Sequence, residues 1–211
     1  MPNPHDRRRP DRGRCATSPQ VRTAGPTDPD LRDTGAVQVI LVRHASPAAS
    51  AAAPPHAWPL TIGGRAAAAA LRLAPALPPG SAAVASTEAK AIETLRLAPD
   101  RASVPTDARF DEVARPGEPF DGAFRAARLA WVEGTVDHRN AAWEPPEQAA
   151  RRFDAGVRAH ASADALVVGT HGMVMTAWLV SIGHVAPGVA AGELWERLTF
   201  PDIVRVEFHM A

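Results

Sequence analysis

The sequence predicts an α/β protein of three layers, with helices on both faces of a mostly parallel central sheet. From residue 36 onward, short apolar runs alternate with longer stretches of helical periodicity, which is the rhythm of repeated strand and helix units. Most of these runs are apolar throughout, as expected for strands that are buried on both faces. The 211 residues are 45% hydrophobic and 22% charged, so the chain can enclose one core of ordinary size.

The first half of this pattern has the order strand, helix, strand, helix. Residues 37–42 are a β-branched run that favours a strand, and residues 82–85 are a second short apolar run. Between them, Thr61 is a typical N-cap for the Ala-rich stretch that extends to about Leu73. Residues 88–97 have helical periodicity, so a second helix is expected there.

The second half follows a loop-rich middle. Residues 124–132 and 145–160 have helical patterns, and residues 165–168 are another apolar strand. The nearly all-apolar helix expected over residues 173–182 must be buried. Residues 203–208 alternate between apolar and polar side chains, which predicts a last strand.

The N-terminal residues 1–35 differ from the rest of the chain in composition. They hold six prolines, three glycines, seven arginines and five aspartates, and besides Met1 only Val21 and Leu31 are sizeable apolar side chains. Such a segment cannot bury enough surface to offset the entropy of ordering it. We therefore predict a disordered tail at 1–35 and one domain at 36–211. An Arg-rich arm for nucleic acid is a weaker alternative, because the aspartates cancel much of its charge.

The overall charge excludes some classes of partner. Lys plus Arg and Asp plus Glu are equal at 23 each, so we expect neither nucleic acid nor a membrane as a partner. No apolar run approaches the roughly 20 residues that span a bilayer. The single Cys15 lies in the tail, which leaves no internal disulfide or cysteine metal cage and favours a reducing, cytoplasmic location. The sequence does not predict the oligomeric state.

Histidines follow two of the predicted strands. The stretch "VILVRH" ends on Arg43 and His44, and "ALVVGTHG" reaches His171 directly before the apolar helix. A lone histidine is usually a hydrogen-bonded core or surface residue, but ligands of parallel sheets bind at the carboxyl ends of the strands. The helix after His171 also favours an anion and disfavours a charged imidazole at its N-terminus. A neutral imidazole can attack an electrophile.

These motifs resemble those of the histidine phosphatase superfamily, also called the phosphoglycerate mutase-like family. "LVRHASP" is similar to its Arg-His-Gly signature and "VVGTHG" to its second histidine motif. Four further stretches match in the same order, and the resemblance covers about residues 37–209: "PLTIGGRAAAAAL", "ASTEAKAIETL", "FDEV" and "EPPEQAARRF". The resemblance implies the three-layer fold with a phosphoglycerate mutase-like sheet.

The resemblance also implies roles for individual residues. His44 would attack phosphorus and form a phosphohistidine that water hydrolyses, while Arg43, Lys90 and His171 would bind the phosphate oxygens. Glu112 matches the acid that protonates the leaving group, with Asp111 and Glu118 as substitutes; a solvated loop carboxylate is the alternative for Glu112. Possible substrate contacts are Ser46, Arg115 and Thr170, although such hydroxyls often bond local backbone.

Two positions depart from the family pattern. Ala45 stands where the family usually has glycine, which is tolerable if the backbone there is not left-handed. Lys90 stands where the family usually has an arginine, and the chain has 22 arginines but this one lysine. We therefore interpret Lys90 as a phosphate contact and not as a casual replacement. An ammonium binds phosphate as a point charge and lacks the planar fork of arginine.

The predicted function is a phosphomonoester hydrolase for a small phosphorylated substrate. No HExxH motif, cysteine cluster or pair of carboxylates at ligand spacing is present, and neither a P-loop nor GxGxxG occurs, so we expect neither a metal nor another cofactor. A phosphoglycerate mutase and a non-catalytic phosphate-binding module remain alternatives. Loops at 46–59 and 114–143 are expected to form the pocket, with Trp58, Trp131 and Trp143 either lining its mouth or packing in the core.

Overall fold

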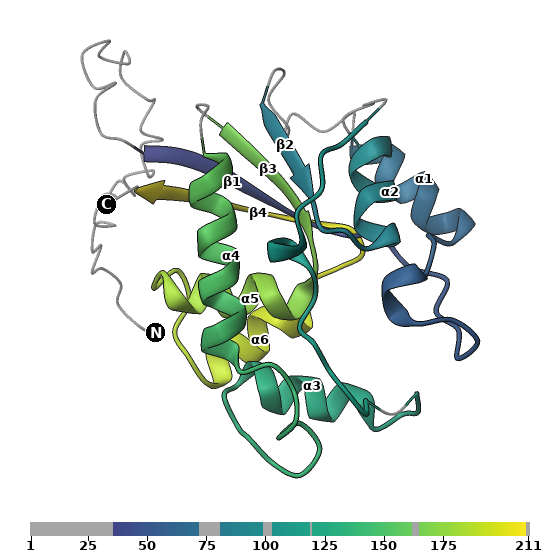
Figure 1. Cartoon of the computed structure of the whole chain (residues 1–211), viewed down its shortest axis with the longest axis vertical. Helices are drawn as coiled ribbons and strands as arrows, with labels where there is room; N and C mark the ends of the chain where they lie inside the picture. The colour runs from purple at the N-terminus through teal and green to yellow at the C-terminus, as the bar shows by residue number, and fades with distance from the viewer. Residues whose placement is uncertain (1–35, 72–80, 99–102, 119, 162–164, 210–211) are drawn as a thin grey trace, which may run out of the picture. The chain divides into compact units, whose positions relative to one another are not determined.

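A four-stranded sheet with the order β2-β3-β1-β4 lies at the centre of the computed structural model (Figure 1). The structure describes residues 36–71, 81–98, 103–118, 120–161 and 165–209. The predicted tail at 1–35 lies outside them, as do the last two residues of the first predicted helix. The strands are β1 (Ala36–Arg43), β2 (Ala82–Ala85), β3 (Ala165–Thr170) and β4 (Asp202–His209).

Three of the strands run parallel. β1 and β2 both pair with β3 in parallel, and β4 pairs with β1 in the opposite direction at the edge. The register places Arg43 beside Thr170 of β3 and beside Asp202 of β4. The carboxyl ends of β1, β2 and β3 therefore meet at one edge of the sheet, where the sequence places Arg43, His44 and His171.

Alternate side chains of β1 pack into two apolar cores on opposite faces of the sheet. Ile40 and Val42 pack into a cluster that includes Leu95 of α2 (Ala89–Leu97) and Leu71 of α1 (Ile62–Leu71). Val39 and Leu41 belong to the larger cluster with Phe153 of α4 (Pro146–His160) and Trp178 of α5 (Gly172–Ser181). The structure thus confirms the predicted layers, with α1 and α2 on one side of the sheet and α4 and α5 on the other (Figure 1).

The predicted elements are confirmed with small shifts of their ends. The helix at 124–132 is α3 (Phe124–Val132) as predicted, β3 extends two residues further than expected, and α5 begins one residue earlier. One helix was not predicted, α6 (Val189–Arg197), which packs on α3 and α5. Two single turns of 3-10 helix, η2 (Pro55–Ala57) and η3 (Ala108–Phe110), lie in the loops. None of the described helices is long and apolar enough to cross a membrane.

Candidate active site

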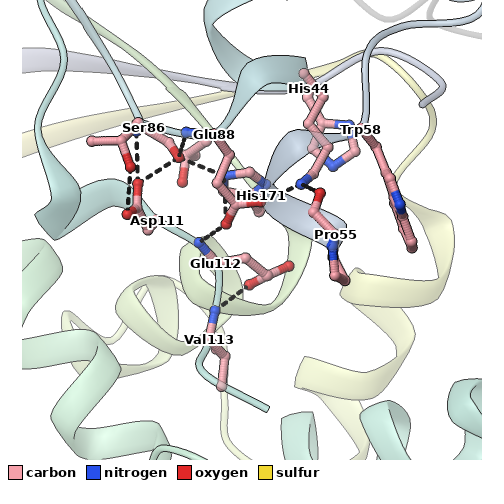
Figure 2. Close-up of polar contacts among 12 residues, drawn as sticks. His44, Pro55, Trp58, Ser86, Glu88, Asp111, Glu112, Val113 and His171 are labelled. Carbon is pink, nitrogen blue, oxygen red and sulfur yellow. Dashed lines mark hydrogen bonds and ion pairs between the residues drawn. The ribbon is translucent and has the colours of Figure 1, made fainter. Parts of the chain in front are cut away.

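Backbone hydrogen bonds join the ends of three strands at the edge of the sheet where the histidines lie. The backbone N–H of His44 donates to the carbonyl of Thr170 at 3.0 Å, and that of Ser86, which follows β2, donates to Gly169 at 2.8 Å. The imidazole rings of His44 and His171 are 5.1 Å apart between centroids. Figure 2 shows both histidines in this region, with His171 joined to Ser86 and Glu88 in a network of polar groups. The structure therefore brings the two predicted histidines together.

His44 presents one free ring nitrogen. Its Nδ1 lies 2.8 Å from the carbonyl oxygen of Ala45, and because a carbonyl only accepts, Nδ1 carries the proton and Nε2 keeps its lone pair. Burial, together with the charges of His171 and Lys90, holds the pKa of His44 well below its usual 6.5. The ring is therefore a neutral imidazole whose Nε2 carries a lone pair.

Arg43 lies beside His44 and is buried. Its Nη1 donates to the carbonyl of Leu198 at 2.6 Å, while its Nε is buried without a hydrogen-bond partner among the described residues. The guanidinium carbon lies 3.6 Å from the ring centroid of Phe200, which also lies 5.2 Å from the His44 ring. Burial lowers the pKa of Arg43 to about 10, so the side chain is still a cation at neutral pH. The unpartnered donor is available to an anion.

Glycine at position 172 permits a close approach between Arg43 and the start of α5. A Cβ atom at Gly172 would lie 3.2 Å from the Arg43 Nε and 3.1 Å from the Trp195 Nε1. These distances are tighter than most real Cβ contacts. The glycine after the second histidine therefore lets the N-terminus of α5 lie against the guanidinium, where the positive end of the helix favours an anion.

His171 is fully buried and is held by side chains. Its Nε2 lies 2.8 Å from Ser86 Oγ, and Ser86 in turn donates to Asp111 at 2.7 Å (Figure 2). Because the only proton of the hydroxyl goes to the carboxylate, Ser86 accepts from the Nε2–H of His171. Its Nδ1 is buried and has no hydrogen-bond partner in the part of the chain that the structure describes. Burial and the charge of Lys90 hold the pKa of His171 well below 6.5.

Lys90 lies in the site but is already paired. Its Nζ donates to the Pro55 carbonyl at 2.9 Å and forms a short ion pair with the carboxylate of Glu88. The other Glu88 oxygen accepts from the backbone N–H of Glu112 at 2.9 Å and lies 3.6 Å from His171 Nε2. Our sequence analysis missed Glu88. The signal was its position two residues before the only lysine, at the N-cap of α2, where extended backbone precedes the helix.

The candidate acids are all held by donors. Both Glu112 oxygens face the start of α5, where Oε1 accepts from Val174 at 3.0 Å and Oε2 from Met173 at 3.2 Å. Burial raises the pKa of Glu112, but the charges of Arg115 and His171 and the backbone donors outweigh burial and bring the pKa down to about 2. Asp111 accepts from Ser86 and from both the backbone and the hydroxyl of Thr87.

Glu118, the third candidate acid, accepts from Arg115 at 2.9 Å and from Arg128 at 2.6 Å. Although burial raises its pKa, the two arginines lower the pKa of Glu118 below the usual value. The lowered pKa values of Glu112 and Glu118 oppose proton donation by these two residues in the free protein.

Of the three predicted substrate contacts, Arg115 and Thr170 are engaged with the protein through their side chains, whereas Ser46 is bonded only through its backbone among the described residues. Thr170 is fully buried and donates to the Phe110 carbonyl at 2.9 Å. The carbonyl of Ser46 accepts from the backbone and hydroxyl of Thr61. Ala45 fills a buried cluster with Leu60 and Ala68, and its N–H donates to Thr94 at 2.9 Å, so its methyl group is accommodated.

A cleft of about 1380 Å³ opens in front of this network. Residues 47–58 and 111–128 supply most of its lining, close to the two loops that the sequence indicates, and Trp195 and Phe200 add a third side that was not predicted. Trp58 lines the cleft, whereas Trp131 and Trp143 are buried in the main core. Within the described part of the chain, no three metal-ligating side chains gather closely enough to hold an ion.

Comparison with known families agrees with this geometry. The model of the histidine phosphatase superfamily, branch 1, matches residues 39–192. The chain belongs to the histidine phosphatase superfamily. The matched span contains both histidines, Arg43 and the network around Ser86, whereas Leu198 and Phe200 lie beyond it. No curated protein sequence matches this chain significantly.

Several solved structures share the fold of this chain. A mycobacterial hydrolase is 20% identical with a TM-score of 0.60, covering 82% of this chain and 93% of that one. The mycobacterial glucosyl-3-phosphoglycerate phosphatase is 19% identical with a TM-score of 0.56, covering 76% and 84%. Phosphoglycerate mutase from Bacillus anthracis str. Sterne is 14% identical with a TM-score of 0.63, covering 84% and 90%. At these identities the likeness establishes the phosphoglycerate mutase-like fold.

Proposed function

We propose that this protein hydrolyses phosphomonoesters without a metal, through a phosphohistidine at His44. The observation that carries the proposal is the fixed tautomer of His44, because the Ala45 carbonyl holds the proton on Nδ1 and leaves the Nε2 lone pair unshared. A neutral ring beside a buried arginine is what attack on a phosphate requires.

The reaction proceeds in two balanced steps. In the first, the Nε2 lone pair of His44 forms a bond to phosphorus, and the bond from phosphorus to the ester oxygen breaks with its electron pair on that oxygen. In the second, water attacks phosphorus and the P–N bond breaks, so its electron pair returns to Nε2. One proton of the water stays on the inorganic phosphate that leaves, and the other goes, directly or through solvent, to the alkoxide released in the first step, which becomes the alcohol.

The cations around His44 supply the electrostatic stabilisation in this proposal. Arg43 offers its unpartnered Nε, and the N-terminus of α5 lies beside it. Lys90 and His171 remain candidate phosphate ligands. For Lys90 that role requires its ammonium to share or leave the Glu88 carboxylate. For His171, Nδ1 must take up a proton when the dianion binds, since its Nε2 is bound to Ser86.

Glu112 remains the acid that the resemblance favours, although it is bound to backbone donors in the free protein. For it to serve as the acid, substrate binding has to release the carboxylate from the start of α5 and raise its pKa. The partner in this proposal is a small phosphoester.

The test is turnover of p-nitrophenyl phosphate together with trapping of the intermediate. Acid-labile, base-stable phosphate bound to the wild type and absent from His44→Ala is the expected result. Turnover that survives in His44→Ala would overturn the mechanism. Tight phosphoester binding with no turnover would instead favour a binding module, and transfer of phosphate between phosphoglycerates without net hydrolysis would favour a mutase.

A further inference from the structure

Arg43 is held by a segment of the chain that lies beyond the matched span of the superfamily. Leu198 and Phe200 belong to the connection between α6 and β4, whereas the match ends at residue 192. The Leu198 carbonyl accepts from Arg43 Nη1 at 2.6 Å, and the centroid of the Phe200 ring lies 3.6 Å from the guanidinium carbon. One short connection therefore supplies both a hydrogen bond and a stacked ring to this arginine.

The exposure of Phe200 differs from that of the groups it touches. The ring also lies 5.2 Å from the His44 ring. Phe200 is 44% exposed, while Arg43 and His44 are 8% and 6% exposed, and no apolar cluster of the described residues includes Phe200. A half-exposed ring gains only part of the free energy of burial, but its attraction to a desolvated cation is stronger than to an exposed one. The position of Phe200 is thus explained by Arg43 and not by the apolar core.

The two contacts restrain the guanidinium in different ways. The hydrogen bond at Nη1 fixes one corner of the planar group but lets the plane turn about that contact. A ring stacked on the guanidinium fixes the plane itself. The Nε of Arg43, which has no hydrogen-bond partner among the described residues, then keeps a single orientation.

The turn that carries Phe200 is fixed by Asp202 at the start of β4. Asp202 Oδ2 accepts from the backbone N–H of Thr199 at 2.7 Å, and its Oδ1 accepts from that of Ile203 at 2.8 Å. The strand register places Asp202 directly beside Arg43. The backbone on both sides of Phe200 is therefore fixed relative to the strand that ends on Arg43.

We infer that Phe200 is a positioning residue, which stacks on Arg43 and holds the orientation in which its Nε donates to a phosphate oxygen at His44. This inference rests on the proposed function for the place of the phosphate. It adds a residue from beyond the matched span to the site. Phe200 takes no part in bond making, and its effect reaches the phosphate only through the arginine.

The experiment measures the Kd of inorganic phosphate by calorimetry at pH 7. Inorganic phosphate has no apolar group, so a direct contact between Phe200 and the alcohol part of a substrate does not contribute. Phe200→Leu keeps an apolar side chain and removes the aromatic face, and we expect the Kd to rise by about five- to tenfold. Phe200→Tyr keeps the face and is expected to bind phosphate within about twofold of the wild type. Equal affinities in Phe200→Leu and the wild type would overturn the inference.

Phe124→Leu is the matched control. Phe124 is 37% exposed, lines the same cleft and lies over an arginine, with its ring centroid 4.7 Å from the Arg128 guanidinium carbon. That arginine is paired with Glu118, so we expect Phe124→Leu to change the Kd by less than about twofold. An equal loss in Phe124→Leu and Phe200→Leu would show an effect of the aromatic wall in general and would overturn a specific role for Phe200. Circular dichroism checks the folding of each variant.

A double-mutant cycle tests whether Phe200 acts through Arg43. Arg43→Lys replaces the planar guanidinium by an ammonium, which has no plane to orient. Phe200→Leu is therefore expected to change the phosphate Kd by no more than about twofold when Arg43 is already lysine. A purely structural role of the ring would give the same loss in both backgrounds, and that result would overturn the inference.

The outcomes separate this inference from the proposed function. If phosphate affinity depends on Phe200 as expected but turnover survives in His44→Ala, the phosphohistidine mechanism fails and the role of Phe200 stands. If the phosphoenzyme forms at His44 but Phe200→Leu binds phosphate as tightly as the wild type, the inference fails and the mechanism stands. A wild-type protein that neither binds phosphate nor hydrolyses p-nitrophenyl phosphate would overturn both.

Discussion

The two histidines of the site occupy equivalent positions in the sheet but are held in different ways. Each follows a parallel strand at its carboxyl end, and the two strands are neighbours. His44 is oriented by the backbone carbonyl of the next residue and keeps Nε2 unbonded. His171 is oriented by Ser86 and Asp111, keeps Nδ1 unbonded and is entirely buried.

In the mechanism that we propose, this difference separates the nucleophile, His44, from a supporting group, His171. A backbone carbonyl cannot be removed by substitution of a side chain, so the tautomer of His44 is independent of the surrounding sequence. The tautomer of His171 depends on a hydroxyl and a carboxylate from two other segments. We therefore expect substitutions around His171 to change activity by degrees, whereas only His44 itself is needed to form the covalent intermediate.

The largest expected effect comes from replacing each histidine by asparagine. His44→Asn removes the attacking nitrogen, and kcat is expected to fall by about 10⁴-fold or more with no phosphoenzyme. His171→Asn removes a group beside the phosphate and is expected to lower kcat by about 10²- to 10³-fold. Quenched-flow trapping of the phosphoenzyme, with kcat measured on the same aryl phosphate, checks both.

If the phosphoenzyme formed in His44→Asn but not in His171→Asn, the nucleophile would be His171 and not His44. Circular dichroism of both variants serves as the control for folding, because both side chains are buried.

Ser86→Ala tests whether His171 depends on its side-chain partners. The change removes the acceptor of Nε2–H and leaves a buried donor without a partner, which costs about 1–3 kcal/mol. We expect kcat to fall by about 10- to 100-fold while the phosphoenzyme still forms at His44. Thr87→Ala is the matched control: it removes another hydroxyl that donates to Asp111 but does not touch His171. Equal losses in the two variants would show that Asp111, and not the orientation of His171, matters.

The positions of both histidines could be predicted from the sequence because they depend on local patterns. β-branched and apolar runs predict strands, and parallel strands end at one edge, so Arg43, His44 and His171 had to meet. α6 was missed because its packing is not local. A Cβ at Gly192, in the middle of that helix, would lie 2.5 Å from the Glu133 carboxylate, so a residue of low helix propensity is needed there for close contact.

The partners of the predicted site residues could not be predicted in the same way. The role of Glu88 depends on the extended backbone before α2, which turns its carboxylate to Lys90 and to the N–H of Glu112. Phe200 reaches His44 from the turn before β4, more than 150 residues along the chain, and no pattern near it indicates a site. Glu112 was predicted from its motif, but its three backbone donors become visible only when α5 is placed.

Glu112→Gln tests the contact between Glu112 and the N-terminus of α5, the helix that follows His171. The neutral amide loses the charge that faces the N-terminus of α5, and its nitrogen faces an N–H donor. We expect the free energy of unfolding to fall by about 1–3 kcal/mol, measured by urea denaturation at pH 7. Glu147→Gln, an exposed residue in the first turn of α4, is the control for loss of a helix N-terminal charge and should cost no more than about 1 kcal/mol. An equal cost in both variants would contradict a specific role for Glu112.

The smallest expected effect concerns the shared property of the two histidines, a pKa well below 6.5. In the unfolded chain both histidines bind a proton below about pH 6.5, whereas in the folded protein they stay neutral, so the unfolded state binds more protons. Their contribution to stability is therefore complete above pH 6.5 and is lost as the pH falls toward their folded pKa values.

The free energy of unfolding is expected to change by about 1.4 kcal/mol per pH unit for each histidine. Urea denaturation between pH 7 and pH 5 measures it as the difference between the wild type and each asparagine variant, which cancels the titration of the carboxylates. If the slope becomes smaller in His171→Asn but not in His44→Asn, His44 is protonated in the folded protein in that pH range and cannot act as a nucleophile there. If the slope decreases equally in both variants, burial keeps both rings neutral despite their different partners.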